Sequence, residues 1–443
     1  MKVLSITAGA AGMYCGSCFR DNALAAELIA RGHDVSLVPL YTPTLTDEPN
    51  VSSRRVLFGG ISVYLQQQSA LFRKTPRLFD RLWDSPGLIR AFASRSQSTN
   101  PVLLGDLTIS MLEGERGTLR KEFDKLLDWM RDEPVPDVIN LPNSLLIALA
   151  APLKRAVGRP ICCTLQGEEL FLDGLQSRYR DRAIALIRQQ VTHVDRFVAV
   201  SDYCAGFMSR LLEIPLARVS VVPLGINMAG YESRPARQNT DPFCVGYFAR
   251  IAPEKGLHVL ADAYVQFRRQ VGSRPVRLEA AGYLGRVHEP YFNEVRRTLE
   301  KAGLAGEFTY RGALDRSAKL AFLRTLDVLS VPATYDEPKG MFLLEAMAAG
   351  VPVVQPRRGA FVEIVERTGG GLLVNPDDPE RLAEGLHTLW QDRATTATLS
   401  HRAFEGVREQ YSVARSADTL LDVYRALLDR GAASHAGAAA SVA

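Results

Sequence analysis

The chain has 443 residues, of which 47% are hydrophobic and 23% are charged. One hydrophobic core rarely serves a chain of this length, so two domains are expected, and the composition is that of a folded globular protein rather than a disordered or fibrous one. The net charge of +4, from 53 basic and 49 acidic residues, excludes the strongly basic surface that is typical of nucleic-acid-binding proteins.

The N-terminal residues have the pattern of a β-loop-α-β unit. A buried strand is expected at 3–7, a helix that Gly32 ends comes next, and a second strand follows at 35–40. Parallel strands need such a crossover helix, and the loop after the first strand opens at the edge of the sheet where α/β proteins bind ligands.

The first loop is rich in small residues. Gly9, Gly12 and Gly16 do not have the spacing of the dinucleotide-binding fingerprint, and they either form a flexible turn or let the backbone approach a ligand closely. Cys15 and Cys18 are spaced like a redox or metal-binding pair, but the chain has no second pair with this spacing. We therefore expect a packed loop with reduced thiols and no metal site.

The region 42–136 has poor periodicity and predicts an enlarged helical excursion from the first domain. Its stretch 71–92 mixes basic residues with leucine, phenylalanine and tryptophan, so it could lie on an anionic membrane surface or form an ordinary amphipathic helix. Apolar runs fall short of the roughly 20 residues that a membrane span needs, and no signal-peptide pattern is visible. We expect a cytoplasmic protein, with contact at the inner membrane surface as an alternative.

Beyond the excursion, strand and helix patterns alternate, which predicts two doubly wound α/β domains. The first is expected at 1–226 and the second at 243–405, joined by a polar linker at 227–242. A helix at 406–430 could pack back on the first domain, and a flexible tail follows at 431–443. The remaining strands are expected at 137–140, 160–165, 196–200, 219–222, 243–247, 276–280, 308–311, 328–331, 353–354 and 372–374.

Two carboxylates, Glu337 and Glu345, have seven residues between them, the first in a loop and the second in a helix that starts after Gly340. The exposed amides of Gly340, Met341 and Phe342 and the positive end of this helix suit a diphosphate. Because phosphate repels a carboxylate, we expect the two acidic groups to bind ribose and donor-sugar hydroxyls instead.

Two cations follow the first strand of the second domain. Arg250 offers a planar fork and Lys255 a compact charge, both at the carboxyl end of a strand, where they could hold a diphosphate. Taken alone, an arginine and a lysine on a surface are more often simply solvated.

These elements resemble the family 4 retaining glycosyltransferases, which carry an Arg…Lys-Gly element followed by a Glu-x7-Glu element. The family folds as GT-B, with two Rossmann-like domains facing each other across a cleft. The resemblance covers most of the chain, including the first loop and the segments 199–201, 221–227 and 369–374.

The resemblance implies a role for each site residue. Arg250 and Lys255 would bind the donor diphosphate, Glu345 the ribose, and Glu337 the donor sugar near the reacting carbon. The first loop, with its glycines, would approach the donor and the acceptor. The second domain would bind most of the donor, and the first domain the acceptor.

The chain departs from the family pattern at three places. Gln166 stands where many members have a histidine; it can donate a hydrogen bond to a sugar hydroxyl or a leaving oxygen, but it cannot carry a proton near neutral pH. Leu224 replaces a common asparagine, and Pro338-Lys339 replaces a glycine-aromatic pair. Lys339 either adds charge for phosphate or is solvated.

The expected function is transfer of a hexose, with retention, from a nucleoside-diphosphate sugar to a hydroxyl of a glycan, lipid or small-molecule acceptor. No Asp-x-Asp triplet occurs, so cations and helix amides rather than a metal ion or other cofactor are expected to neutralise the diphosphate. Two alternatives remain: a sugar-nucleotide epimerase or phosphorylase on the same architecture, and a non-catalytic sugar-nucleotide or glycan-binding protein.

Overall fold

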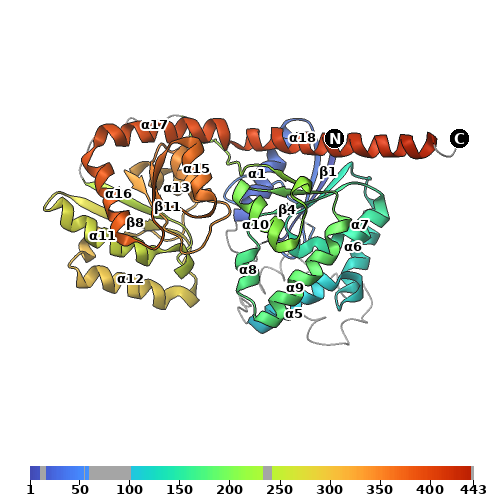
Figure 1. Cartoon of the computed structure of the whole chain (residues 1–443), viewed down its shortest axis with the longest axis horizontal. Helices are drawn as coiled ribbons and strands as arrows, with labels where there is room; N and C mark the ends of the chain where they lie inside the picture. Colours follow the sequence, from blue (N-terminus) through green and yellow to red (C-terminus); the bar gives the residue numbers. More distant parts are fainter. Residues whose placement is uncertain (10–15, 54, 59–100, 233–241, 441–443) are drawn as a thin grey trace. The chain divides into compact units, whose positions relative to one another are not determined.

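The computed structural model describes residues 1–9, 16–53, 55–58, 101–232 and 242–440. The chain separates into two compact units (Figure 1): unit 1 comprises Met1–Pro223 and Ser416–Ala443, and unit 2 comprises Leu224–Arg415. Each unit has its own hydrophobic core of buried aliphatic and aromatic side chains.

Unit 1 contains a parallel sheet in the order β2-β1-β3-β4-β5-β6. Its central strands are buried along their whole length, as expected for a sheet that helices cover on both faces. The strands are β1 (Lys2–Thr7), β2 (Asp34–Pro39), β3 (Val138–Leu141), β4 (Ile161–Leu165), β5 (Arg196–Ala199) and β6 (Val219–Val221).

The helices of unit 1 connect these strands, and the pair α5 and α9 packs side by side (Figure 1). α10 begins where Ser201 accepts a hydrogen bond from the amide of Cys204, a regular N-cap. The helices are α1 (Gly16–Ala30), α5 (Pro101–Glu113), α6 (Arg120–Asp132), α7 (Ala150–Val157), α8 (Glu169–Asp173), α9 (Ser177–Gln190), α10 (Asp202–Leu212) and α18 (Val413–Ala440), with short 3-10 turns at Gly114–Arg116, Ser144–Leu149, Val191–His193 and Leu216–Arg218.

Unit 2 repeats this architecture with the strand order β12-β11-β10-β7-β8-β9, again all parallel. The strands are β7 (Phe243–Phe248), β8 (Val276–Ala281), β9 (Phe308–Tyr310), β10 (Val328–Leu329), β11 (Val353–Pro356) and β12 (Gly371–Val374). The helices are α11 (Leu257–Val271), α12 (Glu289–Lys301), α13 (Arg316–Thr325), α14 (Met341–Ala348), α15 (Gly359–Thr368), α16 (Pro379–Gln391) and α17 (Arg393–Gln410), with 3-10 turns at Pro253–Lys255, Arg286–His288 and Ala305–Glu307.

The predicted fold class is confirmed, because both units are doubly wound α/β domains with parallel sheets. Each strand expected from the sequence overlaps an observed strand. Of the excursion at 42–136, α5 and α6 are described, whereas the amphipathic stretch 71–92 lies outside the described residues. Within the described ranges, the helices are all too short or too polar to cross a membrane.

Candidate functional site

The candidate site of unit 2 lies at the carboxyl ends of β7 and β10. These two strands are neighbours in the middle of the sheet. After β7 the chain adds β8 and β9 on one side, and it then returns to add β10, β11 and β12 on the other side, so the strand order reverses between β7 and β10. Ligands of doubly wound sheets bind at such a switch point. The loops after the two strands contain Arg250, Lys255 and Glu337.

The two loops are packed backbone against backbone. Gly256 has a φ of +73°, and a Cβ atom at this position would lie 1.9 Å from the carbonyl oxygen of Pro332. The amide of Thr334 donates a hydrogen bond of 3.0 Å to the carbonyl oxygen of Glu254. Because only glycine allows this approach, the Lys-Gly pair holds Lys255 against the second loop.

Lys255, Glu337 and Tyr335 form one hydrogen-bonded group. The Lys255 Nζ atom lies 2.5 Å from Glu337 Oε2 and 2.6 Å from the Tyr335 hydroxyl oxygen. Tyr335 in turn donates its hydroxyl proton to the same Oε2 atom. The Lys255 and Glu337 side chains are only 14% and 5% exposed. The structure therefore brings these two predicted residues together, with a tyrosine that the sequence did not single out.

This group fixes the charge of Glu337. Burial alone raises the pKa of the carboxyl, but the Lys255 charge and hydrogen bond, the Tyr335 hydrogen bond and the nearby Lys339 charge outweigh it and lower the pKa from 4.5 to about 2. Burial, reinforced by the Glu337 charge, raises the pKa of the Tyr335 hydroxyl far above its ordinary value. Glu337 is therefore ionised and Tyr335 neutral at physiological pH.

Arg250 lies in the same loop system but is more open to solvent. Its guanidinium is 46% exposed and forms an ion pair of 2.6 Å with Glu254. Its positive charge lowers the pKa of Tyr335 slightly, which places Arg250 within electrostatic reach of the Lys255–Glu337 pair. Both predicted diphosphate-binding cations are thus balanced by a carboxylate in this structure.

The start of α14 faces this group. Gly340 precedes the helix with a φ of +64°, and its amide lies 3.5 Å from Glu337 Oε1. Met341 and Phe342 form the first turn, where backbone amides lack partners within the helix. The Lys255 Nζ atom lies 5.5 Å from the centre of the Phe342 ring. A cation and a helix start therefore lie on the same side of unit 2.

The second predicted carboxylate, Glu345, lies one turn further along α14. Its Oε1 atom is 2.7 Å from the Nζ atom of Lys319, which belongs to α13. Lys319 could not be predicted from the sequence, because the pattern around a single lysine in a helix does not indicate which residue it contacts.

In unit 1 the switch point lies between β1 and β3, and Gln166 follows the neighbouring β4. Gln166 is 3% exposed, and its Nε2 atom donates a 2.6 Å hydrogen bond to the carbonyl oxygen of Pro142. Its Oε1 atom is buried without a hydrogen-bond partner in the part of the chain that the structure describes. Whereas the sequence suggested a hydrogen-bond donor, the geometry presents an acceptor oxygen.

Glu168 joins the loops after β3 and β4. Its Oε1 atom accepts a 2.7 Å hydrogen bond from the amide of Ser144, and its Oε2 atom accepts one of 2.8 Å from the amide of Gln166. The Ser144 hydroxyl and the Asn143 Oδ1 atom are also buried without partners among the described residues. Buried polar atoms are normally satisfied, so this edge suits a ligand that carries hydroxyl groups.

The small residues and cysteines of the first loop differ in where they lie. Gly12 and Cys15 lie outside the described residues, whereas Gly16 is the first residue of α1 and Cys18 is buried. Among the residues that the structure does describe, no group of three or more histidine, cysteine or acidic side chains is placed to hold a metal ion.

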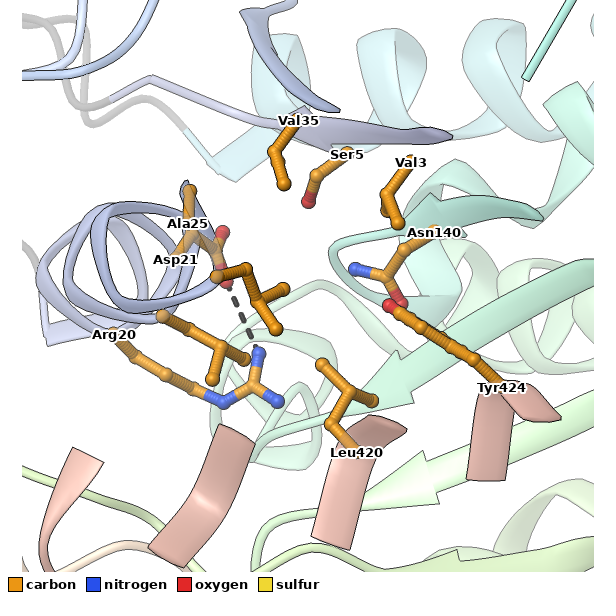
Figure 2. Close-up of a pocket in the computed structure, with 11 residues that line it drawn as sticks. Val3, Ser5, Arg20, Asp21, Ala25, Val35, Asn140, Leu420 and Tyr424 are labelled. Carbon is orange, nitrogen blue, oxygen red and sulfur yellow. Dashed lines mark hydrogen bonds and ion pairs between the residues drawn. The ribbon is translucent and has the colours of Figure 1, made fainter. Parts of the chain in front are cut away.

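Figure 2 shows a small pocket of unit 1 that is lined by residues of α1, α18 and the strands β1, β2 and β3. Arg20 and Asp21 form a buried ion pair of 3.1 Å beside it, and Asn140 and Tyr424 also line it. The pocket has room for about one water molecule, far less than a sugar nucleotide needs. We therefore assign it to the packing of α18 rather than to ligand binding.

Two family models match the chain. The model described as glycosyl transferases group 1 matches residues 232–406, and the model described as glycosyltransferase family 4 matches residues 108–229. Together they cover about two thirds of the chain and include most of the site residues of both units.

Curated relatives include the 2-deoxystreptamine N-acetyl-D-glucosaminyltransferase of Streptomyces fradiae, 26% identical over 68% of this chain and 74% of the relative. The lipopolysaccharide core biosynthesis mannosyltransferase LpsB of Rhizobium meliloti is 29% identical over 42% of this chain and 52% of its own length. The chain thus spans about half the length of some relatives that it matches.

Among solved structures, the HepE protein of Anabaena in complex with UDP superposes with a TM-score of 0.66. The match covers 96% of this chain and 100% of HepE at 18% sequence identity. At that identity the likeness concerns the fold.

Proposed function

Since this chain belongs to the glycosyltransferases of the family 4 type, we propose that it transfers a hexose, with retention of configuration, from a nucleoside-diphosphate sugar to an acceptor hydroxyl. The observation that carries the proposal is the buried Lys255–Glu337 pair beside the start of α14. In this pair the lysine can bind the phosphate part of a sugar nucleotide, and the carboxylate can accept a hydrogen bond from a hydroxyl of its sugar part.

Lys255, Arg250 and the first amides of α14 would bind the diphosphate. When the bond between the anomeric carbon and the β-phosphate oxygen breaks, negative charge develops on that oxygen, and these groups stabilise it. Glu337, ionised because of Lys255, would accept a hydrogen bond from a hydroxyl of the donor sugar. The similarly folded HepE is described in complex with UDP, which supports a nucleoside-diphosphate donor for this chain.

The acceptor hydroxyl would attack the anomeric carbon from the face that the leaving group vacates, and its proton would pass to the departing phosphate oxygen. No resident metal ion or other cofactor is required for this step. Gln166, whose Oε1 atom is an acceptor, would orient a hydroxyl of the acceptor or the donor sugar rather than move a proton.

Release of nucleoside diphosphate from UDP-, GDP- and ADP-sugars, with a panel of hydroxyl acceptors, tests the proposal. Lys255→Ala and Glu337→Gln should each lower turnover by about 100-fold or more, since each removes a group aimed at the transition state. Lys301→Ala, which changes an exposed lysine of the same unit, is the matched control. Activity close to wild type in the two site variants would rule the assignment out.

The products separate the alternatives. Retention predicts that the anomeric configuration in the product, measured by nuclear magnetic resonance, equals that of the donor. Conversion of the donor sugar without any acceptor would identify an epimerase, and turnover that requires inorganic phosphate would identify a phosphorylase. Tight donor binding without transfer to any acceptor would identify a binding protein.

A further inference from the structure

The carboxylate of Glu345 is held by a lysine from another helix. Lys319 on α13 places its Nζ atom 2.7 Å from Glu345 Oε1, and the two side chains are 5% and 12% exposed. α13 precedes β10 and α14 follows it, so the ion pair links the two helices that flank the strand of the switch point.

Stability alone is a weak reason for such a pair. Removing two charges from water costs several kcal/mol per ion, and apolar residues of similar volume often serve a buried contact as well or better. The neighbouring side chains of α14, Leu343 and Leu344, are fully buried and show that this helix packs well through apolar groups. A charged pair here therefore points to a role beyond packing.

The geometry suits presentation of the carboxylate to a ligand. In an α-helix the Cα–Cβ bonds tilt toward the N-terminus, so Glu345 leans toward the end of α14 where Lys255 and Glu337 lie. A carboxylate has about four acceptor positions on its two oxygens. An ion pair on Oε1 fixes the orientation of the group and does not by itself use up this acceptor capacity.

We propose that Lys319 is a positioning residue that holds the Glu345 carboxylate, ionised and oriented, to accept hydrogen bonds from the ribose hydroxyls of a nucleoside diphosphate. The inference rests on the proposed function and deepens it. Lys319 does not touch the nucleotide; it acts through Glu345 and sets the preference of unit 2 for ribose over sugars that lack these hydroxyls.

The test is the ratio of two affinities measured by calorimetry. The nucleoside diphosphate that binds best among UDP, GDP and ADP is compared with its 2′,3′-dideoxy form. The wild type should bind the ribose form about 10- to 100-fold more tightly, as expected for hydrogen bonds to a charged acceptor. In Lys319→Met the ribose form should lose most of this advantage, while the dideoxy form binds about as before.

Two further variants keep the test decisive. Lys319→Gln retains a polar contact without the charge, and it should also reduce the ratio if Lys319→Met does not fold. Arg268→Met breaks a second ion pair of unit 2, the 2.8 Å contact with Glu307, and should leave the ratio unchanged.

If Lys319 only stabilised the fold, replacing it would lower the affinity for both nucleotides equally. An unchanged ratio in a folded Lys319→Met or Lys319→Gln protein would therefore overturn this inference and leave the proposed function intact. If the wild type binds none of the three nucleoside diphosphates, both proposals are wrong.

Discussion

At the scale of the residue, the electrostatic state of Glu337 is decided by its neighbours rather than by its burial. A buried carboxyl without partners would have a raised pKa, yet Lys255 and Tyr335 lower it to about 2. A carboxyl whose pKa is lower in the folded than in the unfolded state stabilises the fold above its unfolded pKa, here 4.5, and loses this contribution as the pH falls toward 2.

Glu337→Gln should therefore destabilise the protein by a pH-dependent amount. The difference in the free energy of unfolding from wild type should be constant from pH 8 to pH 5, be on the order of 3 kcal/mol, and shrink only below about pH 4.5. Urea unfolding followed by circular dichroism at a series of pH values measures it. Glu366→Gln, which removes an exposed carboxylate paired with Arg357, is the control.

A difference that grows as the pH falls from 8 to 5 would contradict this prediction. It would mean that burial outweighs the Lys255 charge and that Glu337 titrates above its ordinary value.

Part of this candidate site could be predicted from the sequence, and the rest could not, for a physical reason. Glu337, Glu345 and the cation at 255 stand in local patterns around a strand end and a helix start, so they could be predicted. Tyr335 and Lys319 could not, because their roles depend on which side chains the packing of separate elements brings together.

At the scale of the element, one carboxylate connects the loops after β3 and β4. Glu168 accepts amide hydrogen bonds from Ser144 and Gln166 with its two oxygens. In Glu168→Gln one oxygen is replaced by an NH₂ group that cannot accept, so one amide loses its partner, which costs about 1–3 kcal/mol when the group is buried.

Hydrogen exchange measured by mass spectrometry should therefore be faster in Glu168→Gln by about tenfold or more in peptides that contain residues 142–144 and 166–168, because local opening becomes easier. Peptides of unit 2 should exchange as in the wild type. Asp173→Asn, which changes the exposed partner of Arg180, is the matched control. Faster exchange throughout the chain would indicate general destabilisation, and it would contradict a local role of Glu168 in holding the two loops together.

The elements themselves followed from the sequence. Buried strands and amphipathic helices alternate in both units with clear local periodicity, so their existence and approximate bounds could be predicted. The order of the strands depends on contacts distant in the chain, and periodicity contains no information about it.

At the scale of the whole molecule, the chain leaves unit 1 after Pro223 and returns to it from Ser416 onward. The returning helix α18 buries Leu420, Leu421 and Tyr424 in unit 1, where Leu420 and Tyr424 line the pocket beside the Arg20–Asp21 pair (Figure 2). The Ser416 hydroxyl also donates a 2.6 Å hydrogen bond to the carbonyl oxygen of Pro223. The part of α18 around Leu420 and Tyr424 therefore packs against β1 and α1 of unit 1.

Tyr424→Ala should consequently destabilise unit 1 by about 3–5 kcal/mol, the usual cost of removing a fully buried aromatic ring. Because Arg250, Lys255, Glu337, Glu345 and Lys319 all belong to unit 2, the variant should bind a nucleoside diphosphate with an affinity within about twofold of wild type. Calorimetric unfolding and nucleotide titration measure the two effects. Asp422→Ala, on the exposed side of the same helix, should change neither quantity.

A loss of nucleotide affinity in Tyr424→Ala that matches its loss of stability would contradict this prediction. It would mean that the shape of the donor site depends on unit 1, although all five residues belong to unit 2.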